Sequence, residues 1–241
     1  KVMPVLLILP VTGLITSILL LGEDPPKQVF LGGLVIIFGV ALILFTKKIK
    51  NMNNSLPKNA KAVIIGGGVA GCSCAYHLSK FGWKDVVLLE RDQLTSGTTW
   101  HAAGLVSQLG PTAAVTKIRK YSLELYKRLE KEIDFSSGLK LNGALSIATT
   151  KGRWQELLRQ ATTAQLYDVN VEILNIKQIK KIYPLINEDD ILGGIFMPGD
   201  GQADPVGVTN LLAKAARKEG AKIFQNSPVN KILTKNGRVC G

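Results

Sequence analysis

A glycine-rich turn between an apolar strand and a helix is the feature that most constrains how this chain folds. The run Ala62–Ile65 is typical of a buried parallel strand, and it leads directly into the sequence GGGVAG. That sequence fits G-x-G-x-x-G: the first glycine permits a tight turn, the second lets a pyrophosphate approach the backbone, and the third lets the next helix pack closely. The marked positions are Gly66, Gly68 and Gly71. A helix expected over residues 69–81 would direct its free N–H groups and positive dipole end at the phosphates.

An acidic residue follows the next apolar run at the spacing that a dinucleotide requires. Val86–Leu89 reads as a second strand and ends at Glu90, 19 residues after Gly71. A carboxylate at the tip of this strand can accept hydrogen bonds from both ribose hydroxyls of an adenosine. A glycine turn of purely structural use is the alternative, but it does not explain why Glu90 falls at this position. The sequence therefore predicts an α/β fold with a dinucleotide-binding domain of the Rossmann type.

Two apolar segments precede this domain and predict a membrane hairpin over residues 1–50. Val5–Leu21 and Val29–Phe45 are free of charge and 17 residues long each, close to the length of a membrane-spanning helix. The basic cluster Lys47, Lys48 and Lys50 follows, which favours the cytoplasmic side for that end and for the remainder of the chain. A signal peptide and a buried core hairpin are the alternatives. On Pro10-Val11 and Leu21-Gly22-Glu23, residues 1–46 resemble the last two helices of drug/metabolite-type permeases, so a membrane transport component is one alternative function.

Residues 51–61 are polar, contain one proline and show no apolar period, which predicts a linker. The linker contains Met52, and we expect Met52 to be a natural start, with the preceding residues belonging to another gene product. If mass spectrometry of the native protein finds one polypeptide that crosses Met52, this expectation is wrong.

The pattern beyond the turn predicts alternating helices and strands in two parts. Residues 62–135 and 198–241 are assigned to the dinucleotide-binding domain, and residues 136–197 to part of a substrate domain. Apolar periodicity predicts a helix over 115–133 with a buried stripe that includes Ile118 and Tyr121, and a helix over 205–219 with Asp204 as its N-cap. Strands are expected at 221–224 and 229–233, with a turn at Asn236-Gly237. The last strand starts just before Gly241, so we expect the fold to continue beyond this fragment.

Charge and cysteine content exclude several functions. The net charge is +12, but the basic residues are dispersed among acidic ones without an aromatic-rich basic stripe, which argues against nucleic-acid binding. Three cysteines form neither a disulfide framework nor a paired metal site, so no metal is expected. Of the two histidines, His77 falls in the middle of a predicted helix and is interpreted as a surface or packing residue. His101 falls in a loop of small and polar residues, 96–104, where the second half of a bound dinucleotide would emerge.

Four segments together resemble the dimethylglycine/sarcosine dehydrogenase family of flavoproteins, within the D-amino-acid-oxidase-like superfamily. They are GGGVAG, LLER, TSGTTWHAAGL and FMPGDGQADP, and the resemblance covers nearly all of residues 62–241. It implies an FAD bonded covalently through its 8α-methyl group to His101, with Glu90 on the adenosine ribose and Arg91 beside it. It also places Val229 in a strand that contacts the adenine. The predicted cofactor-binding residues are Gly66, Gly68, Val69, Ala70, Gly71, Glu90, Arg91, Ser96, Thr98, Thr99, Trp100, His101, Gly104, Leu105 and Val229.

The resemblance also implies a reaction. The enzyme would oxidise the N-methyl group of a small secondary or tertiary amino acid by hydride transfer to the flavin, and the resulting iminium would hydrolyse to formaldehyde and the demethylated amine. Family members often carry a folate-binding C-terminal part, which these residues do not include. The catalytic base is expected beyond Gly241, so we expect the fragment to be inactive alone. A non-enzymatic regulatory homologue that retains the flavin fold is the second alternative.

Overall fold

The computed structural model describes residues 32, 35, 38, 39 and 56–241. The chain divides into two compact units, residues 1–57 and 58–241. The predicted membrane hairpin apart from residues 32, 35, 38 and 39, and residues 51–55 of the predicted linker, lie outside the described residues. Within the described ranges, no helix combines the length and apolar character needed to cross a bilayer.

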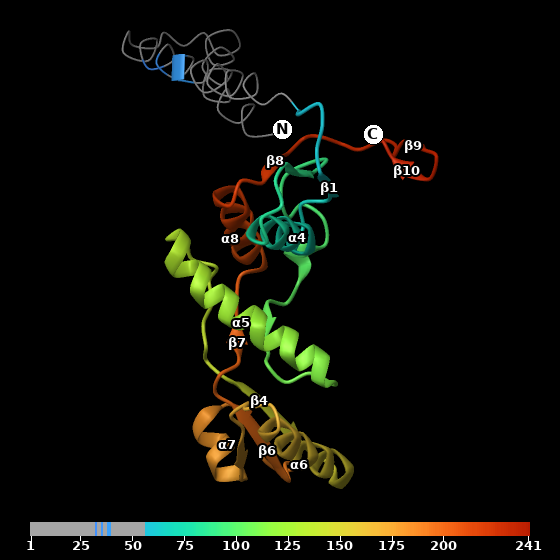
Figure 1. The fold of residues 1–241 in the computed structure, drawn as a ribbon. Helices are drawn as coiled ribbons and strands as arrows, with labels where there is room; N and C mark the ends of the chain where they lie inside the picture. The colour runs from blue at the N-terminus through green and yellow to red at the C-terminus, as the bar shows by residue number, and fades with distance from the viewer. Residues whose placement is uncertain (1–31, 33–34, 36–37, 40–55) are drawn as a thin grey trace. The chain divides into compact units, whose positions relative to one another are not determined.

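A parallel three-stranded sheet with two helices, built from both ends of residues 58–241, forms one part of this unit (Figure 1). The strand order is β1-β2-β8, and Ala62 pairs in register with Val86. Helices α4 and α8 pack against each other in the same hydrophobic core as β2. The bounds are β1 Ala62–Ile65, α4 Val69–Lys80, β2 Val86–Leu89, α8 Pro205–Lys218 and β8 Lys222–Phe224. This is the predicted Rossmann-type arrangement of strand, turn, helix and strand.

Helix α8 begins where its sequence predicts. The Asp204 carboxylate accepts hydrogen bonds from the N–H groups of Val206 and Gly207, both at 3.0 Å, and Pro205 occupies the first turn. The apolar positions spaced at i, i+3 and i+4, among them Leu211 and Leu212, are buried. The cap fixes the start of a helix whose apolar face completes the core.

Replacing Asp204 with alanine should lower the free energy of unfolding by about 1 kcal/mol, because two backbone N–H groups lose their acceptor. Urea denaturation of the two proteins measures the change. Asp204→Ser, which retains an acceptor oxygen, is the matched control and should lose much less. Equal losses in both variants would show that the cap contributes nothing.

A separate antiparallel sheet, formed by residues between β2 and α8, makes up another part of this unit. Its strand order is β4-β6-β5, with α6 and α7 packed on it (Figure 1). Leu157 of α6 and Ile195 of β6 are fully buried in one small core, and Ile179 of α7 is fully buried in another. The bounds are β4 Ala144–Ala148, α6 Lys151–Gln165, β5 Glu172–Leu174, α7 Ile176–Ile182 and β6 Gly193–Met197.

Short elements and one long helix connect the two sheets. Strand β3 pairs with β7 in an antiparallel ladder of two residues each, and neither strand is predicted from the sequence. A single turn of 3₁₀ helix, η1, precedes β3, and α5 packs on α8. The bounds are η1 Thr99–His101, β3 Leu105–Val106, α5 Ala113–Ile133 and β7 Gly201–Gln202.

The predicted buried stripe of α5 is wrong in its first half. Leu125 and Leu129 are buried as expected, but Ile118 and Tyr121 are 65% and 49% exposed. The inner position is taken by Thr116, which is fully buried because its hydroxyl bonds to the carbonyl of Thr112 (3.0 Å) and accepts from the Gly110 N–H (3.0 Å). The spacing of apolar residues does not predict which side of a helix is buried where a polar side chain, here Thr116, occupies the buried side through hydrogen bonds.

The strand predicted over 229–233 is also wrong, so Val229 does not lie in a strand. Residues 225–233 have no regular secondary structure. Among the described residues, their backbone-to-backbone hydrogen bonds lie only at the two ends, where Asn226 and Ser227 donate to Asp92 and Glu90 and where Leu233 pairs with Cys240 and Gly241. The hairpin that follows is confirmed: β9 (Thr234–Lys235) pairs with β10 (Arg238–Val239) across Asn236-Gly237. Both turn residues have positive φ, 51° and 73°, as a two-residue hairpin turn requires.

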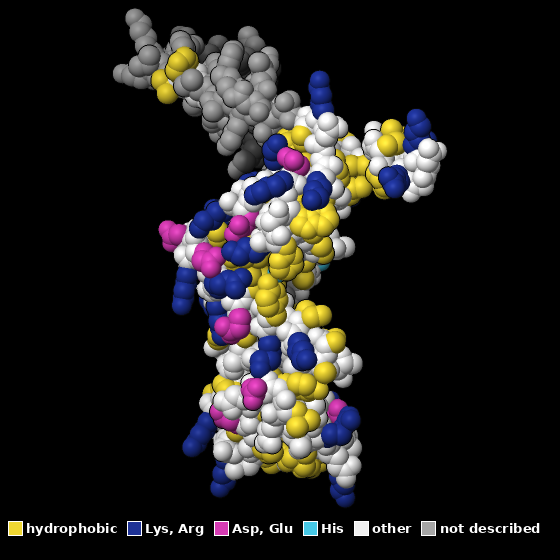
Figure 2. Space-filling view, viewed as in Figure 1, with side chains coloured by type: hydrophobic (Ala, Val, Ile, Leu, Met, Phe, Trp, Pro, Cys, Tyr) yellow, Lys and Arg dark blue, Asp and Glu magenta, His cyan; other side chains and the backbone are white. Residues whose placement is uncertain are grey.

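Lys and Arg side chains are interspersed with Asp, Glu and hydrophobic side chains on the face drawn in Figure 2. On this face, as along the sequence, basic side chains are mixed with acidic ones.

Candidate cofactor site

The three marked glycines have the backbone geometry that a phosphate-binding turn needs. Gly66 follows β1 with φ +106°, a conformation that L side chains rarely adopt. Gly68 is the N-cap of α4 and has no side chain to screen the first N–H groups of that helix. A Cβ at Gly71 would lie well inside 3.0 Å of the Gly66 carbonyl oxygen, a separation that real Cβ atoms essentially never show. The turn thus depends on Gly71 for the close approach of α4 to β1.

Glu90 is anchored against this turn. The side chain is buried at the end of β2, and its Oε2 accepts a hydrogen bond from the Gly67 N–H at 2.6 Å. Its Oε1 accepts from the Asp92 N–H at 2.9 Å. An ionised carboxylate offers about four acceptor positions, so two remain for hydroxyl donors. The acid that the spacing singled out therefore lies against the glycine turn, with acceptor positions still free.

The loop rich in small polar residues reaches the same turn through Thr99. The Val69 N–H at the start of α4 donates to Thr99 Oγ1 at 3.2 Å. A Cβ at Gly68 would come within 2.9 Å of that hydroxyl oxygen. The neighbouring rings of Trp100 and His101 lie 3.8 Å apart between centroids, and both side chains are exposed. Thr99 therefore brings the loop that carries His101 to the N-terminus of α4.

The other predicted residues are placed less closely around the turn. Gly104 has φ +72°, and its carbonyl accepts from the Ala203 N–H at 2.8 Å, which joins the loop to the start of α8. Leu105 is exposed, and Arg91 is exposed and pairs with Asp92 at 3.4 Å. The side chains of Ser96 and Thr98 are exposed as well. The structure thus brings the glycine turn, Glu90 and Thr99 together.

These groups fit the adenosine diphosphate half of an FAD. The N-terminus of α4 supplies backbone donors and the positive end of a helix dipole, the glycines leave space for phosphate oxygens, and Glu90 supplies acceptors. Cys72 lies in the first turn of α4, with its thiol sulfur 3.7 Å from the Gly67 carbonyl oxygen of the glycine turn. Burial raises the pKa of this thiol to about 11, so it stays neutral and acts as a packing group.

Asp200 is a buried acid that the sequence analysis did not single out. It has no accessible surface, and its Oδ1 accepts from both the backbone N–H of Gln108 (2.9 Å) and the side-chain amide of Gln108 (3.2 Å). Its Oδ2 has no hydrogen-bond partner among the described residues. Burial raises the pKa of Asp200, and the bonds from Gln108 and the charge of Arg119 oppose this shift. The available signal was an acid in the turn Pro198-Gly199-Asp200-Gly201 between two strands.

The raised pKa of Asp200 predicts a pH-dependent loss of stability. The unfolded chain releases this proton near the ordinary value of 3.8, and the folded chain releases it at a higher pH. The stabilisation from the bound proton is therefore complete below that value and is lost as pH rises through the raised pKa. The side chain at position 200 in Asp200→Asn does not ionise. The free energy of unfolding of this variant, minus that of the wild type, should therefore increase as pH rises from below 4 to neutral.

Urea unfolding at a series of pH values measures this difference. Asp190→Asn, at an exposed position, is the control for the removal of one negative charge. A constant difference between Asp200→Asn and the wild type across the range would contradict the prediction.

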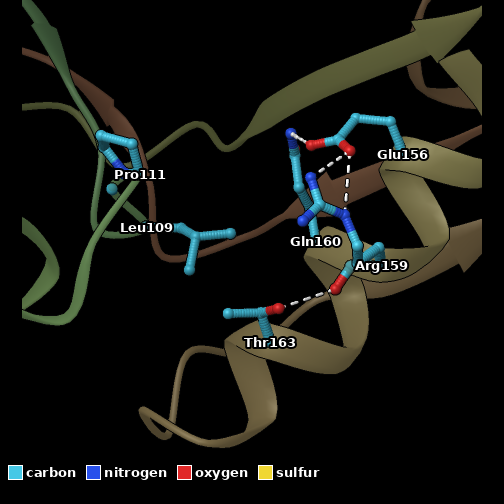
Figure 3. A pocket seen from close by; sticks show the side chains of 7 residues that line it. Leu109, Pro111, Glu156, Arg159, Gln160 and Thr163 are labelled. Atoms are coloured by element: carbon cyan, nitrogen blue, oxygen red, sulfur yellow. Dashed lines mark hydrogen bonds and ion pairs between the residues drawn. The ribbon is translucent and has the colours of Figure 1, made fainter.

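A cavity of about 400 Å³ lies between the loop after β3 and helix α6 (Figure 3). Leu109, Gly110 and Pro111 line one side, and side chains of α6 line the other. The polar groups on α6 bond to one another: Arg159 pairs with Glu156, and the Gln160 amide donates to Glu156 at 3.0 Å. The α6 wall of the cavity is therefore polar but internally satisfied.

Comparison with known proteins identifies the family of this chain. A family model described as FAD dependent oxidoreductase matches residues 61–241. Sarcosine dehydrogenase, mitochondrial, from Homo sapiens is 42% identical over 178 residues, which cover 73% of this chain and 19% of that protein. Dimethylglycine dehydrogenase, mitochondrial, from Rattus norvegicus is 43% identical over 173 residues, which cover 72% and 20%. The chain thus spans about a fifth of the length of these curated relatives.

Two further similarities bear on fold and function. The pyruvate dehydrogenase phosphatase regulatory subunit, mitochondrial, from Mus musculus is 36% identical over 187 residues, which cover 78% of this chain and 21% of that protein. The crystal structure of L-proline dehydrogenase from P. horikoshii superposes with a TM-score of 0.71 at 28% identity and covers 76% of this chain and 48% of that one. Since the family model spans residues 61–241, most of the chain, the chain belongs to the FAD-dependent oxidoreductase family.

Proposed function

We propose that this chain is the FAD-binding part of an amine oxidoreductase of the sarcosine and dimethylglycine dehydrogenase type. The observation that carries the proposal is the convergence of the glycine turn, Glu90 and Thr99 at the N-terminus of α4. Identity above 40% to relatives named for these two substrates supports the substrate class, a small N-methyl amino acid.

Each group at the turn has a proposed role in holding the adenosine diphosphate half. The N–H groups at the start of α4 bind the diphosphate, and the hydroxyl of Thr99, now bonded to Val69, bonds to a phosphate oxygen. The two free acceptor positions of Glu90 take the ribose hydroxyls. Arg91, Ser96, Thr98, Gly104 and Leu105 border this path, and Val229 is proposed to approach the adenine.

His101 is proposed to tether the flavin ring covalently. A neutral imidazole nitrogen is a nucleophile, and the exposed ring beside Trp100 is open to an electron-poor methyl group of the cofactor. Forming the N–C bond would break one methyl C–H bond and release the imidazole N–H proton, and the two electrons would reduce the flavin ring, which an external oxidant such as O2 would then reoxidise. Such a bond would hold the ring in one position and favour a reactive geometry. A flavin held here would supply a hydride acceptor for the N-methyl carbon of the substrate, and water would hydrolyse the resulting iminium to formaldehyde and the demethylated amine.

Visible absorbance of the native polypeptide that contains this chain tests the proposal. We expect the spectrum of an oxidised flavin, and we expect anaerobic addition of sarcosine or dimethylglycine to bleach it. A colourless protein would contradict flavin binding.

A non-enzymatic regulatory homologue is the second candidate, because a relative named as a regulatory subunit is 36% identical to this chain. A flavin spectrum that neither amine bleaches, in a protein that reduces normally with dithionite, would favour this candidate over the enzyme.

Membrane association through residues 5–45, a cytoplasmic location and a folate-binding C-terminal part stay predictions from the sequence. The relatives named above as sarcosine and dimethylglycine dehydrogenases are named as mitochondrial, so a mitochondrial location is the competing proposal. Fractionation of cells followed by detection of a peptide on each side of Met52 tests the membrane and location predictions together.

A further inference from the structure

Three polar side chains from other elements hold the segment that follows β3. The Asp200 carboxylate accepts both donors of Gln108, at 2.9 and 3.2 Å. Arg119 donates to the Ser107 hydroxyl at 3.2 Å and to the Leu109 carbonyl at 2.6 Å. Thr116 accepts from the Gly110 N–H at 3.0 Å. Residues 107–110 have no regular secondary structure, so these side chains replace the ladder that would otherwise fix them.

Asp200 is the member of this group whose burial most needs an explanation. It has no accessible surface, and one of its oxygens has no partner among the described residues, which is an unfavourable arrangement for a carboxyl group. A solvent-exposed loop could satisfy the Gln108 N–H with water at no such cost. Because both bonds of Asp200 go to Gln108, the buried acid acts on that residue.

Residues 107–110 lie between β3 and the cavity, so the bonds that hold them act on both. This segment follows directly from Leu105–Val106, the strand that continues the loop of His101. Its last two residues, Leu109 and Gly110, line the cavity together with Pro111. The same four residues thus join the flavin side of the chain to one wall of a cavity of about 400 Å³.

We propose that Asp200 is a positioning residue that, through Gln108, fixes residues 107–110 and thereby the alignment of β3 with the cavity wall. Any effect of Asp200 on the position of a flavin rests on the proposed function. Its effect on the conformation of residues 107–110 does not depend on that proposal.

Hydrogen exchange of the native polypeptide, measured on the peptide that covers residues 105–112, tests the positioning directly. In Asp200→Ala we expect exchange in this peptide to be about tenfold faster, as for the loss of one buried hydrogen bond. Asp200→Asn retains an acceptor oxygen and should keep exchange close to that of the wild type. Asp190→Ala, at an exposed position, is the matched control. Unchanged exchange in Asp200→Ala, or equal acceleration in Asp200→Asn, overturns the proposal.

A second variant keeps the test decisive if Asp200→Ala does not fold. Gln108→Leu removes only the side-chain bond, so it should accelerate exchange of the same peptide by a smaller factor while Asp200→Asn stays protected. No acceleration in Gln108→Leu overturns the proposal.

The circular dichroism of the flavin in the visible range separates positioning from simple structural support. We expect its shape to change in Asp200→Ala and to be restored in Asp200→Asn. If exchange of the 105–112 peptide becomes faster in Asp200→Ala but the circular dichroism of the flavin does not change, Asp200 does not position the cofactor. A protein without flavin that still shows the exchange pattern contradicts the proposed function and supports the role of Asp200.

Discussion

Gly71→Ala is expected to abolish flavin binding and to lower the free energy of unfolding by about 3 kcal/mol. The added Cβ would fall well inside 3.0 Å of the Gly66 carbonyl oxygen, which is backbone and cannot rotate away. Helix α4 would have to move from β1, and the N–H groups that face the diphosphate would move with it. Visible absorbance of the purified variant measures the first effect, and urea denaturation measures the second.

Gly152→Ala is the matched control for this substitution. Gly152 lies in the first turn of α6, with nothing within 4 Å of its ideal Cβ position. The same added methyl group should therefore raise the free energy of unfolding by about 0.5 kcal/mol and leave the flavin in place. If Gly71→Ala retained flavin and matched Gly152→Ala in stability, the close packing of the turn would have no role in cofactor binding.

His101→Ala should remove the covalent bond to the flavin completely and leave the fold intact. The imidazole is exposed, so its loss should change the free energy of unfolding by less than about 0.5 kcal/mol. The glycine turn and Glu90 are untouched, so FAD should still bind, but acid precipitation should release it into the supernatant. In the wild type, the colour should stay with the precipitate.

His77→Ala is the control, because His77 is the other histidine of the chain. It lies on α4, where its Nε2 is 2.8 Å from the Tyr121 hydroxyl and its Nδ1 is 2.7 Å from the Ser73 carbonyl. The variant should lose some stability and keep its colour in the precipitate. Colour that stays with precipitated His101→Ala would show that the flavin is bonded elsewhere or bound by another means.

The parts of the fold that follow from local pattern could be predicted from the sequence. The turn at Gly66–Gly71 and the helix it starts are specified by neighbouring residues, and so is the start of α8 at Asp204-Pro205. Glu90 could be placed because its distance along the chain from the turn is set by one helix and one strand. In each case the sequence within about thirty residues carries the whole signal.

The parts that depend on distant partners could not be predicted. Strands β3 and β7 are two residues long each and exist only because Leu105 pairs with Gln202 across the chain. The inner face of the first half of α5 is set by bonds between Thr116 and the preceding loop, not by its apolar residues. The alternation at 229–233 resembles a strand, but only Leu233 finds backbone partners among the described residues, at Cys240 and Gly241, so no ladder forms over 229–232.

The contact between Asp200 and Gln108 belongs to the same class. The two residues are 92 positions apart, and neither has a local pattern that points to the other. The turn that carries Asp200 could be predicted from its glycines, but the burial of its acid required the structure.

The most direct test of a flavin held at this turn and tethered by His101 is a tryptic peptide map of the native protein. Peptide 92–117 contains the whole loop and one histidine. We predict that this peptide carries the mass of a covalent flavin and that fragmentation assigns it to His101. An unmodified peptide 92–117 from a protein that shows no flavin spectrum would contradict the account.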